Sequence, residues 1–354
     1  MNKQNKKFID ACYGNPVPYT PLWIMRQAGR YLPEYRAVRK QHTFHEMMHT
    51  PDLMTEVTLQ PIRRYGFDAA IMFSDILVIP EAMGVNFKLI ENVGPVFDNP
   101  LDTMEKVKSI QLADSTHLQH VFEGVKQIRN ELDSSKALIG FSGAPWTIAS
   151  YMVEGKPSKD YRHIRSLMHA EPITFHHLMD TLTESIITYV TEQVNAGADA
   201  IQIFDTNASY LSREVFETFS FPYLKRIVNA VNALNVPCIL FVKGGGHWLD
   251  LLKTSGAHVL GIDWTVSLKD AKVAVNDSVS LQGNLDPSIL LAPNDVIEKE
   301  VCKVLESYGE GNGHIFNLGH GITPDIPLEA VQTVVDTVRA ESPKYKLQSI
   351  GIND

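Results

Sequence analysis

The chain has 354 residues, of which 44% are hydrophobic and 21% are charged, and its formal net charge is −9. This is an ordinary globular composition, and an acidic balance without a basic helix or stripe argues against a nucleic-acid partner. The longest uncharged stretch, residues 137–153, is too short and too rich in glycine, serine and proline to cross a bilayer, so no membrane segment is predicted.

The cysteines and the N-terminus indicate the compartment. Cys12, Cys238 and Cys302 are far apart and form no CxxC pair, which argues against a disulfide framework or a zinc site. We expect them to be small buried side chains in a reducing environment. The lysine-rich first ten residues are not followed by the apolar run of a signal peptide. These features predict a cytoplasmic protein.

Short apolar runs bounded by turn residues recur along the whole chain. Most are apolar on both faces and contain β-branched or aromatic residues, as is typical of strands buried in a parallel sheet. They cover residues 22–25, 69–73, 137–141, 200–204, 237–242, 258–262, 279–281 and 315–318.

Helical patterns lie between these runs. The clearest has Leu178, Leu182, Ile186 and Val190 at intervals of four and ends at Gly197. A helix over residues 54–65 contains Pro61, which argues against its second half. The remaining predicted helices cover residues 116–132, 213–234, 247–253, 268–275, 295–308 and 328–339.

Eight strands alternating with helices predict an α/β fold, a single (β/α)8 barrel domain over residues 1–354. A doubly wound sheet is the alternative. The two units between residues 237 and 281 are short, so we expect a somewhat distorted barrel. Residues 98–114 are polar and broken by Pro100, which predicts an excursion before the third strand.

Polar or glycine-rich residues follow every predicted strand. In a barrel these positions meet at the carboxyl ends of the strands, where catalytic residues gather. In chain order they are Arg26 and Arg30, Ser74-Asp75, Ser142-Gly143 with Tyr151, Asp205-Thr206-Asn207, Lys243-Gly244-Gly245-Gly246, Asp263-Trp264, Gln282-Gly283-Asn284 and Gly319-His320-Gly321.

The first of these ends carries the densest signal. Arg26, Arg30, Arg36 and Arg39 fall within fourteen residues around Gly29. Because a guanidinium stays ionised and its fork matches carboxylate or phosphate, the cluster predicts an anion site. The alternative is a set of solvated surface charges or ion pairs at a helix start, but the density of arginine in an acidic chain favours the anion site.

The other strand-end residues each have a structural alternative. Asp75 could cap a helix, His320 could be a hydrogen-bonded structural residue, and Tyr151 could serve packing alone. Aspartates at strand ends could hold Mg²⁺, but no spacing requires it. His176 and His177 are adjacent on a helix and point in different directions, so they are poor joint ligands. We therefore expect an enzyme without a metal or an organic cofactor.

Six motifs spread over the chain resemble those of the uroporphyrinogen decarboxylase family. The resemblance implies a distorted (β/α)8 barrel, a homodimer without cofactors, and removal of four acetate carboxylates from uroporphyrinogen III to give coproporphyrinogen III in haem biosynthesis. The motifs are Met25-Arg26-Gln27-Ala28-Gly29-Arg30-Tyr31-Leu32-Pro33-Glu34-Tyr35-Arg36, Phe73-Ser74-Asp75-Ile76-Leu77, Gly143-Ala144-Pro145-Trp146-Thr147, Tyr151-Met152-Val153-Glu154-Gly155, Gln282-Gly283-Asn284-Leu285-Asp286-Pro287 and Asn317-Leu318-Gly319-His320-Gly321.

The resemblance also implies roles for single residues. Asp75 matches a carboxylate that meets the pyrrole N–H groups, and Arg26 is both a substrate ligand and a candidate proton donor. Thr206 stands where some members have serine, which keeps a hydroxyl but adds a methyl group. The other implied substrate contacts are Arg30 and Arg39 as basic residues, Gln27, Ala28 and Gly29 as the loop between the first two arginines, Tyr151 and His320 as polar contacts, and Phe204 as an aromatic wall.

The sequence leaves two other functions open. A zinc- or corrinoid-type methyltransferase of related fold would need His and Cys ligands near strand ends, and Cys238 lies within a strand with no His-x-Cys neighbour. A non-catalytic tetrapyrrole carrier could share the arginines but would not need Asp75. The proton donor also stays open between Arg26, a substrate carboxylic acid, water, and His320 acting through Tyr151.

Overall fold

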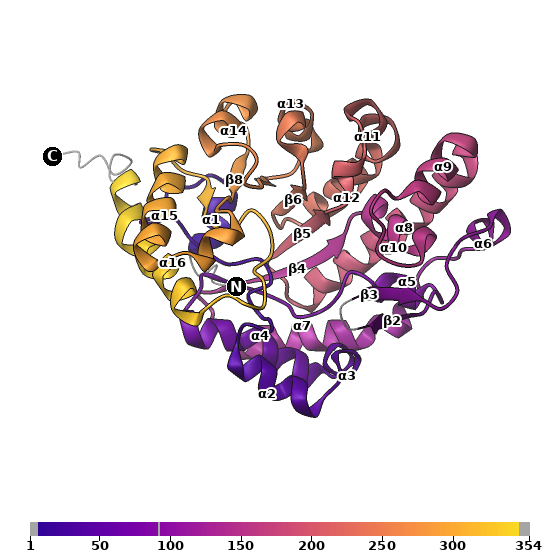
Figure 1. Cartoon of the computed structure of the whole chain (residues 1–354), viewed down its shortest axis with the longest axis horizontal. Coiled ribbons are helices and arrows are strands. Elements are labelled where there is room, and N and C mark those ends of the chain that lie inside the picture. Colours follow the sequence, from indigo (N-terminus) through magenta and orange to yellow (C-terminus); the bar gives the residue numbers. More distant parts are fainter. Residues whose placement is uncertain (1–5, 91–92, 347–354) are drawn as a thin grey trace.

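The computed structural model describes residues 6–90 and 93–346 (Figure 1). Its centre is a parallel sheet in which sequential strands are neighbours, as in a barrel and unlike a doubly wound sheet. The strand order is β1 (Ala69–Ile71), β4 (Ala137–Gly143), β5 (Ala200–Asp205), β6 (Cys238–Val242), β7 (Val259–Gly261), β8 (Ser280–Gln282) and β9 (His314–Ile315).

The segment that contains Leu22 joins the two edges of this sheet. On one side Leu22 forms a parallel bridge to Phe316, whose N–H donates to the Pro21 carbonyl at 2.8 Å. On the other side the Asp68 N–H donates to the Leu22 carbonyl at 3.0 Å. The sheet is thereby closed into the predicted (β/α)8-type barrel, with a distortion at this position.

The prediction of a regular strand over residues 22–25 was wrong. Side chains accept three of the four N–H groups of this segment, at distances of 2.9–3.1 Å, and only the Trp23 N–H reaches a backbone acceptor, the Phe316 carbonyl at 3.4 Å. The acceptors are Asp68 for Leu22, Gln27 for Ile24 and Asn317 for Met25. The sequence shows the apolar run but not these three distant or looped acceptors.

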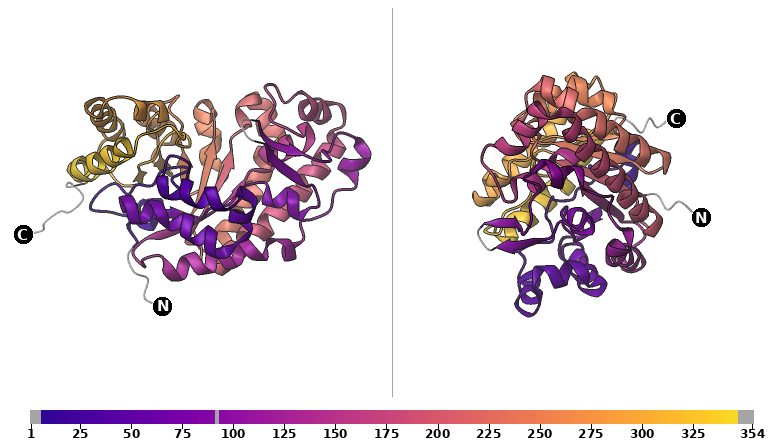
Figure 2. Two further views of the ribbon diagram at one scale, coloured as in Figure 1. Left: turned by 60° about the horizontal axis from the view of Figure 1, so that its bottom comes forward. Right: turned by 90° about the vertical axis from the view of Figure 1, so that its right-hand side faces the viewer.

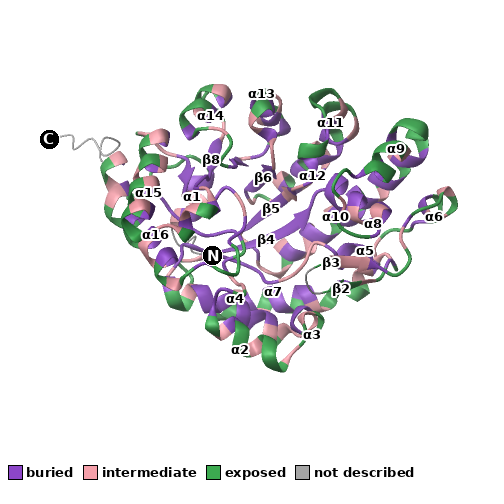
Figure 3. Cartoon of the chain, in the orientation of Figure 1, coloured by how far each residue is buried: buried purple, intermediate pink, exposed green. Residues whose placement is uncertain are grey.

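Helices surround the sheet (Figure 1), and their buried faces pack on it while their outer faces are exposed (Figure 3). The α-helices are α1 (Lys7–Cys12), α2 (Pro33–Gln41), α3 (Phe44–His49), α4 (Pro51–Tyr65), α5 (Val78–Ala82), α6 (Met104–Lys108), α7 (Gln119–Glu131), α8 (Pro145–Glu154), α9 (Arg162–Ala170), α10 (Pro172–Ala196), α11 (Arg213–Phe219), α12 (Phe221–Ala233), α13 (Leu249–Leu252), α14 (Leu268–Val275), α15 (Asn294–Tyr308) and α16 (Leu328–Glu341).

Two helix predictions need correction. Helix α4 continues through Pro61 to Tyr65, because Pro61 is buried and packing against the core outweighs the loss of one backbone hydrogen bond. The predicted helix over residues 213–234 is two helices, which meet at Ser220 just before Pro222. Helix α10 ends at Ala196 with Gly197 at a φ of 120°, as predicted.

The predicted excursion before the third barrel strand exists but begins earlier. An antiparallel hairpin of β2 (Phe87–Ile90) and β3 (Gly94–Phe97) precedes it and lies beside α5 and α6 (Figures 1 and 2). The hairpin was not predicted because its strands are half exposed and lack a strong apolar pattern. The lysine-rich N-terminal segment lies in part outside the described residues and continues into α1.

A polar layer crosses the interior of the barrel. The Trp23 indole Nε1 donates to Gln282 Oε1 at 2.8 Å, and Gln282 Nε2 donates to Gln202 Oε1 at 3.1 Å. All three side chains are fully or almost fully buried and come from separate strand positions, so they meet only across the interior.

Among the described residues, no helix is long and apolar enough to cross a membrane.

Candidate active site

Arg26 is the first residue of the candidate site along the chain, and it follows the segment at Leu22 that joins the two edges of the sheet. Its φ of 65° lies in the left-handed region, which costs a non-glycine residue on the order of 1–3 kcal/mol. The turn is held by Gln27, whose N–H donates to the Ile24 carbonyl at 2.8 Å, and by Ile322, whose N–H donates to the Met25 carbonyl at 3.0 Å. Strained backbone that is held this firmly is typical of functional positions.

The Arg26 side chain lies against Gly321. A Cβ placed on Gly321 would be only 2.3 Å from Arg26 Cδ and 2.8 Å from Arg26 Nε. Because Gly321 adjoins His320, this contact brings the first and the last strand ends together. The positive charge of Arg26 acts on Asp75, Tyr151 and His320. The structure therefore places these three predicted residues within electrostatic range of Arg26.

The guanidinium groups of Arg26 and Arg30 are available to a ligand. Both residues are exposed, and among the residues that the structure describes neither forms an ion pair. Arg36 instead donates to the Arg30 carbonyl at 2.9 Å and the Tyr31 carbonyl at 3.0 Å. Its role is therefore to hold the loop, while Arg26 and Arg30 keep their charges free for an anion.

Asp75 follows β1 and lies beside Arg26. Burial raises the pKa of the Asp75 carboxyl, while the Leu77 N–H that donates to Oδ1 at 2.9 Å and the Arg26 charge lower it. The negative charge of Glu81, in the following helix α5, raises it again. The Asp75 carboxylate is half-buried, and the described residues give it one hydrogen-bond donor, so it can accept further N–H donors from a ligand.

His320, at the last strand end, also lies near Arg26. Burial lowers the pKa of His320 to about 4, and the positive charges of Arg26 and Lys243 add to the effect, while Asp263 opposes it. The imidazole is therefore neutral at pH 7. Asp263 is held by N–H groups of Gly244 at 2.6 Å and Thr265 at 2.9 Å, so it fixes the loops rather than offering a free carboxylate.

This neutral imidazole gives the first prediction. Since His320 titrates near pH 4, the pH–rate profile between pH 6 and 8 should contain no limb from this residue. We expect His320→Asn to lower the rate at every pH in this range by a similar factor and to leave the profile's shape unchanged. Steady-state rates over pH 5–9 test this, and a limb near pH 6–7 that disappears in His320→Asn would contradict it.

Aromatic rings line the neighbouring strand ends. The Phe204 ring packs edge-on to Phe141 and Phe241, with centroids 5.9 and 6.1 Å away, and Phe241 in turn lies 6.1 Å from the His320 ring. Phe204 is only half-buried, so part of its ring faces the space beyond the strands. Thr206, also half-buried, is on the same strand end between two buried polar residues, Asp205 and Asn207.

A buried hydrogen-bond network fixes the strand end that carries Phe204 and Thr206. Asp205 is fully buried, and it accepts from the Thr147 hydroxyl at 2.6 Å and from the Ser220 hydroxyl at 3.3 Å. Burial raises the pKa of Asp205 to about 6, although both hydroxyls lower it. Asn207 donates to Ser150 Oγ at 2.7 Å, which fixes the loop that carries Thr206.

Asp205 predicts a pH-dependent stability. Its pKa is higher in the folded state than the usual 3.8, so the folded protein binds the proton more tightly and loses stability as the pH rises through about 6. The loss is up to about 3 kcal/mol, at 1.36 kcal/mol for each unit of pKa. Asp205→Asn should remove this component. Urea unfolding at pH 4.5 and 7.5 tests it: the variant should gain stability relative to wild type at the higher pH, and a constant difference would contradict it.

The side chains of two predicted contact residues, Gln27 and Arg39, bond to the protein's own backbone. The Gln27 side chain is fully buried, accepts from the Ile24 N–H at 3.1 Å and donates to the Ala69 carbonyl at 3.1 Å. Arg39 is exposed in α2 and donates to the His42 carbonyl at 2.6 Å. Ala28 packs partly against the core, and a Cβ on Gly29 would lie 3.0 Å from the Arg26 carbonyl oxygen. The loop is thus shaped by Gln27 and Gly29, with Arg39 outside the central group.

Sequence reasoning missed Tyr161. It lies beside the Tyr151 hydroxyl together with Asn207, has a φ of 49°, and its ring packs on Tyr210 with centroids 4.6 Å apart. Nothing in the local sequence marks it, because its position depends on the loop after α8.

Sequence reasoning also missed a histidine pair. Residues 45–49 read His-Glu-Met-Met-His, which fits the H-E-x-x-H spacing of zinc-binding helices. The prediction considered only His176 and His177 as joint histidine ligands, and the conclusion that the chain has no H-E-x-x-H motif was wrong. The spacing alone was a sufficient signal.

A hollow of about 690 Å³ lies at the other end of the barrel. It is lined by His258 and Ser280, which stand at the amino ends of β7 and β8. Barrel enzymes react at the carboxyl ends of their strands. The hollow is therefore not part of the candidate site.

The fold and the site together define a barrel enzyme that acts on an anionic small molecule, with arginines and a half-buried carboxylate at the carboxyl ends of the strands. The comparisons with known proteins are specific. The uroporphyrinogen decarboxylase (URO-D) family matches residues 3–341. The chain belongs to the uroporphyrinogen decarboxylase family.

Curated relatives match over almost their whole length. The uroporphyrinogen decarboxylase of Hydrogenovibrio crunogenus is 48% identical over 97% of this chain and 98% of its own, and that of Mannheimia succiniciproducens is 46% identical over the same shares. A solved structure of a methyltransferase from Methanosarcina mazei has a TM-score of 0.80, with 24% identity over 94% of this chain and 97% of its own. This last similarity concerns the fold.

Proposed function

We propose that this protein decarboxylates the four acetate side chains of uroporphyrinogen III to give coproporphyrinogen III, without a metal or an organic cofactor, in one barrel domain over residues 1–354. Family membership supports the reaction. The observation that carries the site is the meeting of Arg26, Asp75, Tyr151 and His320 at one end of the barrel, with the arginine unpaired among the described residues.

The arginines bind the substrate's carboxylates. The substrate has eight of them, and a guanidinium holds a carboxylate by two parallel hydrogen bonds. Arg26 and Arg30 are the primary ligands, presented by a loop that Gln27, Ala28 and Gly29 shape. Arg39 lies farther out and adds positive charge at the rim, where it attracts the anion rather than fixing it.

Asp75 stabilises the charge that develops during the reaction. Loss of CO2 from an acetate on a pyrrole would leave a carbanion unless the ring is first protonated. Protonation makes the ring cationic, and it then accepts the electron pair of the breaking C–C bond as CO2 leaves. A proton added to the resulting exocyclic methylene gives the methyl group, and the ring loses the proton it gained. A carboxylate that accepts the pyrrole N–H groups stabilises this cation, and the same N–H donors favour the ionised form of Asp75.

The side chains around Asp75 orient the macrocycle. The half-buried Phe204 ring offers a flat apolar face, and the Thr206 hydroxyl next to it is a polar contact. Tyr151 and His320 contribute polar groups on the remaining sides. A neutral His320 can donate one hydrogen bond and accept another, so it can orient a carboxyl group.

The proton that enters the ring comes from the solvent or the substrate. His320 has a pKa of about 4 and is not a cationic acid at neutral pH. Arginine rarely releases a proton. A substrate carboxylic acid or a water molecule held by Arg26 is therefore the donor that the site supports best, with Arg26 as the residue that positions it.

Methyl transfer is the alternative that the fold itself raises, since a methyltransferase shares it. A zinc-thiolate centre at the strand ends would need cysteines there. Cys238 is buried at the amino end of β6, Cys12 is buried in α1, and Cys302 lies in α15. None of the three is at the carboxyl end of a barrel strand, so the residues present favour decarboxylation.

The experiment is an anaerobic incubation of purified protein with chemically reduced uroporphyrinogen III, followed by oxidation and chromatography by carboxylate number. We expect porphyrins with seven, six and five carboxylates as intermediates and four as the final product. Tight binding without any loss of carboxylates would instead identify a tetrapyrrole carrier.

We further propose that the protein is a cytoplasmic homodimer, as the family resemblance implies. Light scattering of the eluted protein tests the assembly, and a mass of twice the chain is the expected result. A mass equal to one chain at micromolar concentration would contradict the dimer.

A further inference from the structure

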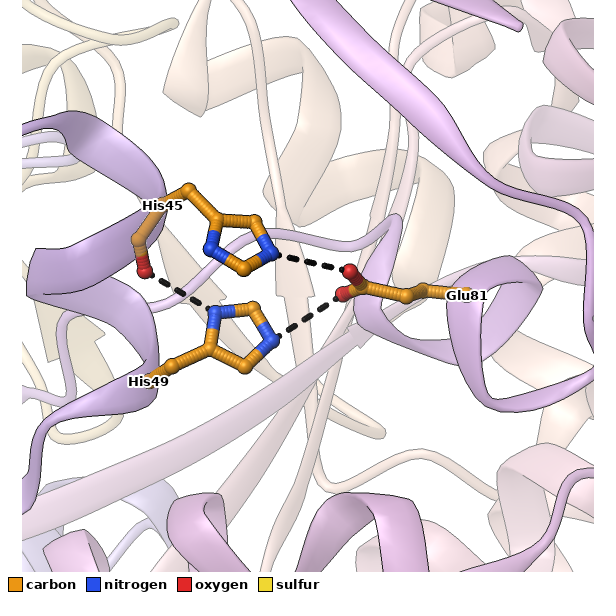
Figure 4. A group of neighbouring side chains, drawn as sticks. All are labelled: His45, His49 and Glu81. Atoms are coloured by element: carbon orange, nitrogen blue, oxygen red, sulfur yellow. Dashed lines mark hydrogen bonds and ion pairs between the residues drawn. The ribbon is translucent and has the colours of Figure 1, made fainter. Parts of the chain in front are cut away.

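Two histidines and a glutamate that are not among the predicted site residues converge on one point (Figure 4). His45 and His49 are four residues apart on α3, so both rings project from the same face. Glu81 faces them from α5. His45 Nε2 is 3.1 Å from Glu81 Oε1, and His49 Nε2 is 3.2 Å from Glu81 Oε2.

These distances suit a shared ion. The three ligand atoms all lie within 4.8 Å of one another. Around a tetrahedral Zn²⁺ with bonds of about 2.0–2.1 Å, neighbouring ligand atoms are about 3.3–3.4 Å apart. Each histidine Nε2 is already near that distance from one of the two Glu81 oxygens, so a small opening of the group admits an ion.

One histidine is already oriented as a ligand. His49 Nδ1 contacts the His45 carbonyl oxygen at 2.9 Å, a contact in which the ring nitrogen donates. A proton on Nδ1 leaves Nε2, the atom that faces Glu81, as the metal-binding nitrogen. This outer hydrogen bond from a ligand histidine to a carbonyl is the usual support of a metal site.

A third histidine stands next to the group. The His120 ring stacks on His49 with centroids 4.2 Å apart, and its buried Nε2 has no hydrogen-bond partner among the described residues. A buried imidazole nitrogen without a partner is costly unless something binds it. It adds a further nitrogen donor next to the three converging groups.

The site differs from that of a metalloprotease with the same H-E-x-x-H spacing. Glu46, the residue that would act as general base, caps its own helix: it accepts from the Thr43 N–H at 2.6 Å, and its N–H donates to Thr43 Oγ1 at 3.1 Å. It is thereby held at the helix start. The group can bind a metal but lacks a poised base for hydrolysis.

We propose that His45, His49 and Glu81 form a binding site for one borderline transition-metal ion, of which Zn²⁺ is the representative. Two imidazoles and a carboxylate suit Zn²⁺, Cu²⁺ or Ni²⁺ and not Mg²⁺ or Ca²⁺, which prefer oxygen ligands. The His45 side chain is 61% exposed, which leaves a path for the ion.

The ion would join α3 to α5. Helix α5 begins at Val78, directly after Leu77, whose N–H holds Asp75. Binding therefore cross-links the segment that carries the proposed catalytic carboxylate to the neighbouring helix. The role is structural.

The test is metal binding by the full-length protein, without a histidine tag and stripped with chelator. Equilibrium dialysis against Zn²⁺ should give one ion per chain, and Zn²⁺ should raise the melting temperature by about 2–5 °C at saturating concentration. His49→Gln and Glu81→Gln should each weaken binding about tenfold or more. The matched control His177→Gln, an exposed histidine on α10, should bind like the wild type.

Two results would overturn the proposal. One is no Zn²⁺ bound by the wild type at micromolar free metal. The other is equal Zn²⁺ affinity in the wild type and in His49→Gln, which would place the ion elsewhere, for instance at the partly exposed Cys302 that both proteins retain. Mg²⁺ in place of Zn²⁺ should leave the melting temperature unchanged.

Discussion

Asp75→Asn is expected to lower turnover by about a hundredfold or more while leaving substrate binding nearly intact. The amide is isosteric, and its oxygen can still accept the Leu77 N–H that Asp75 accepts at 2.9 Å, so the local turn should persist. What is lost is the negative charge next to the ring that becomes cationic. An oriented charge of this kind contributes about 3 kcal/mol to transition-state stabilisation. Anaerobic single-turnover rates and a binding isotherm for the substrate measure the two quantities separately.

Asp114→Asn is the matched control. Asp114 Oδ1 accepts the N–H of Thr116, two residues later, also at 2.9 Å, but on an exposed turn. Both variants therefore change the same capping contact, and only Asp75 faces the proposed reaction. Full turnover in Asp75→Asn with unchanged binding would refute the proposed role of the carboxylate.

Gly321→Ala is expected to lower kcat/KM about tenfold or more, chiefly by raising KM. The new Cβ would sit 2.3 Å from Arg26 Cδ, so the arginine must leave its present position. The φ of Gly321 lies outside the left-handed region, so alanine fits the backbone, and the exposed arginine can swing into solvent at little cost in stability. A displacement of about 1 Å in a positioning group is enough for a large loss of rate.

Two controls separate the loss of Arg26 positioning from general damage. Gly124→Ala puts a Cβ 2.3 Å from Met54 Sδ, between α4 and α7, and should lower stability by about 1–3 kcal/mol without changing kcat/KM. In an Arg26→Ala background, Gly321→Ala should have no further effect on kcat/KM, because the clashing side chain is gone. Additive losses in the double variant would contradict this account.

Much of the fold could be predicted because buried parallel strands are continuous apolar runs. Seven of the eight predicted strands are present, and α14 begins and ends at the predicted residues. The secondary-structure predictions that were wrong share a cause, because the structure at those positions depends on tertiary contacts. The segment at Leu22 is held by Asp68, Gln27 and Asn317, which no local pattern links to it.

In the candidate site, too, some features follow from the order of the strands and others depend on tertiary contacts. That Arg26, Asp75 and His320 meet follows from strand order once a barrel is assumed. The neutral state of His320 does not, because it depends on burial and on the charges of Arg26 and Lys243. The motif that predicts Gln27 as a contact does not show that its side chain bonds to the backbone of Ile24 and Ala69. Side-chain direction in an irregular loop is not encoded in residue type.

The most direct test of the central claim is the stoichiometry of CO2 release by chelator-treated protein under anaerobic conditions. Four CO2 should be released for each uroporphyrinogen III consumed, at the same rate before and after metal removal, because the roles proposed for Arg26 and Asp75 need no metal. No CO2 release, or release that depends on added Zn²⁺ or an organic cofactor, would contradict it.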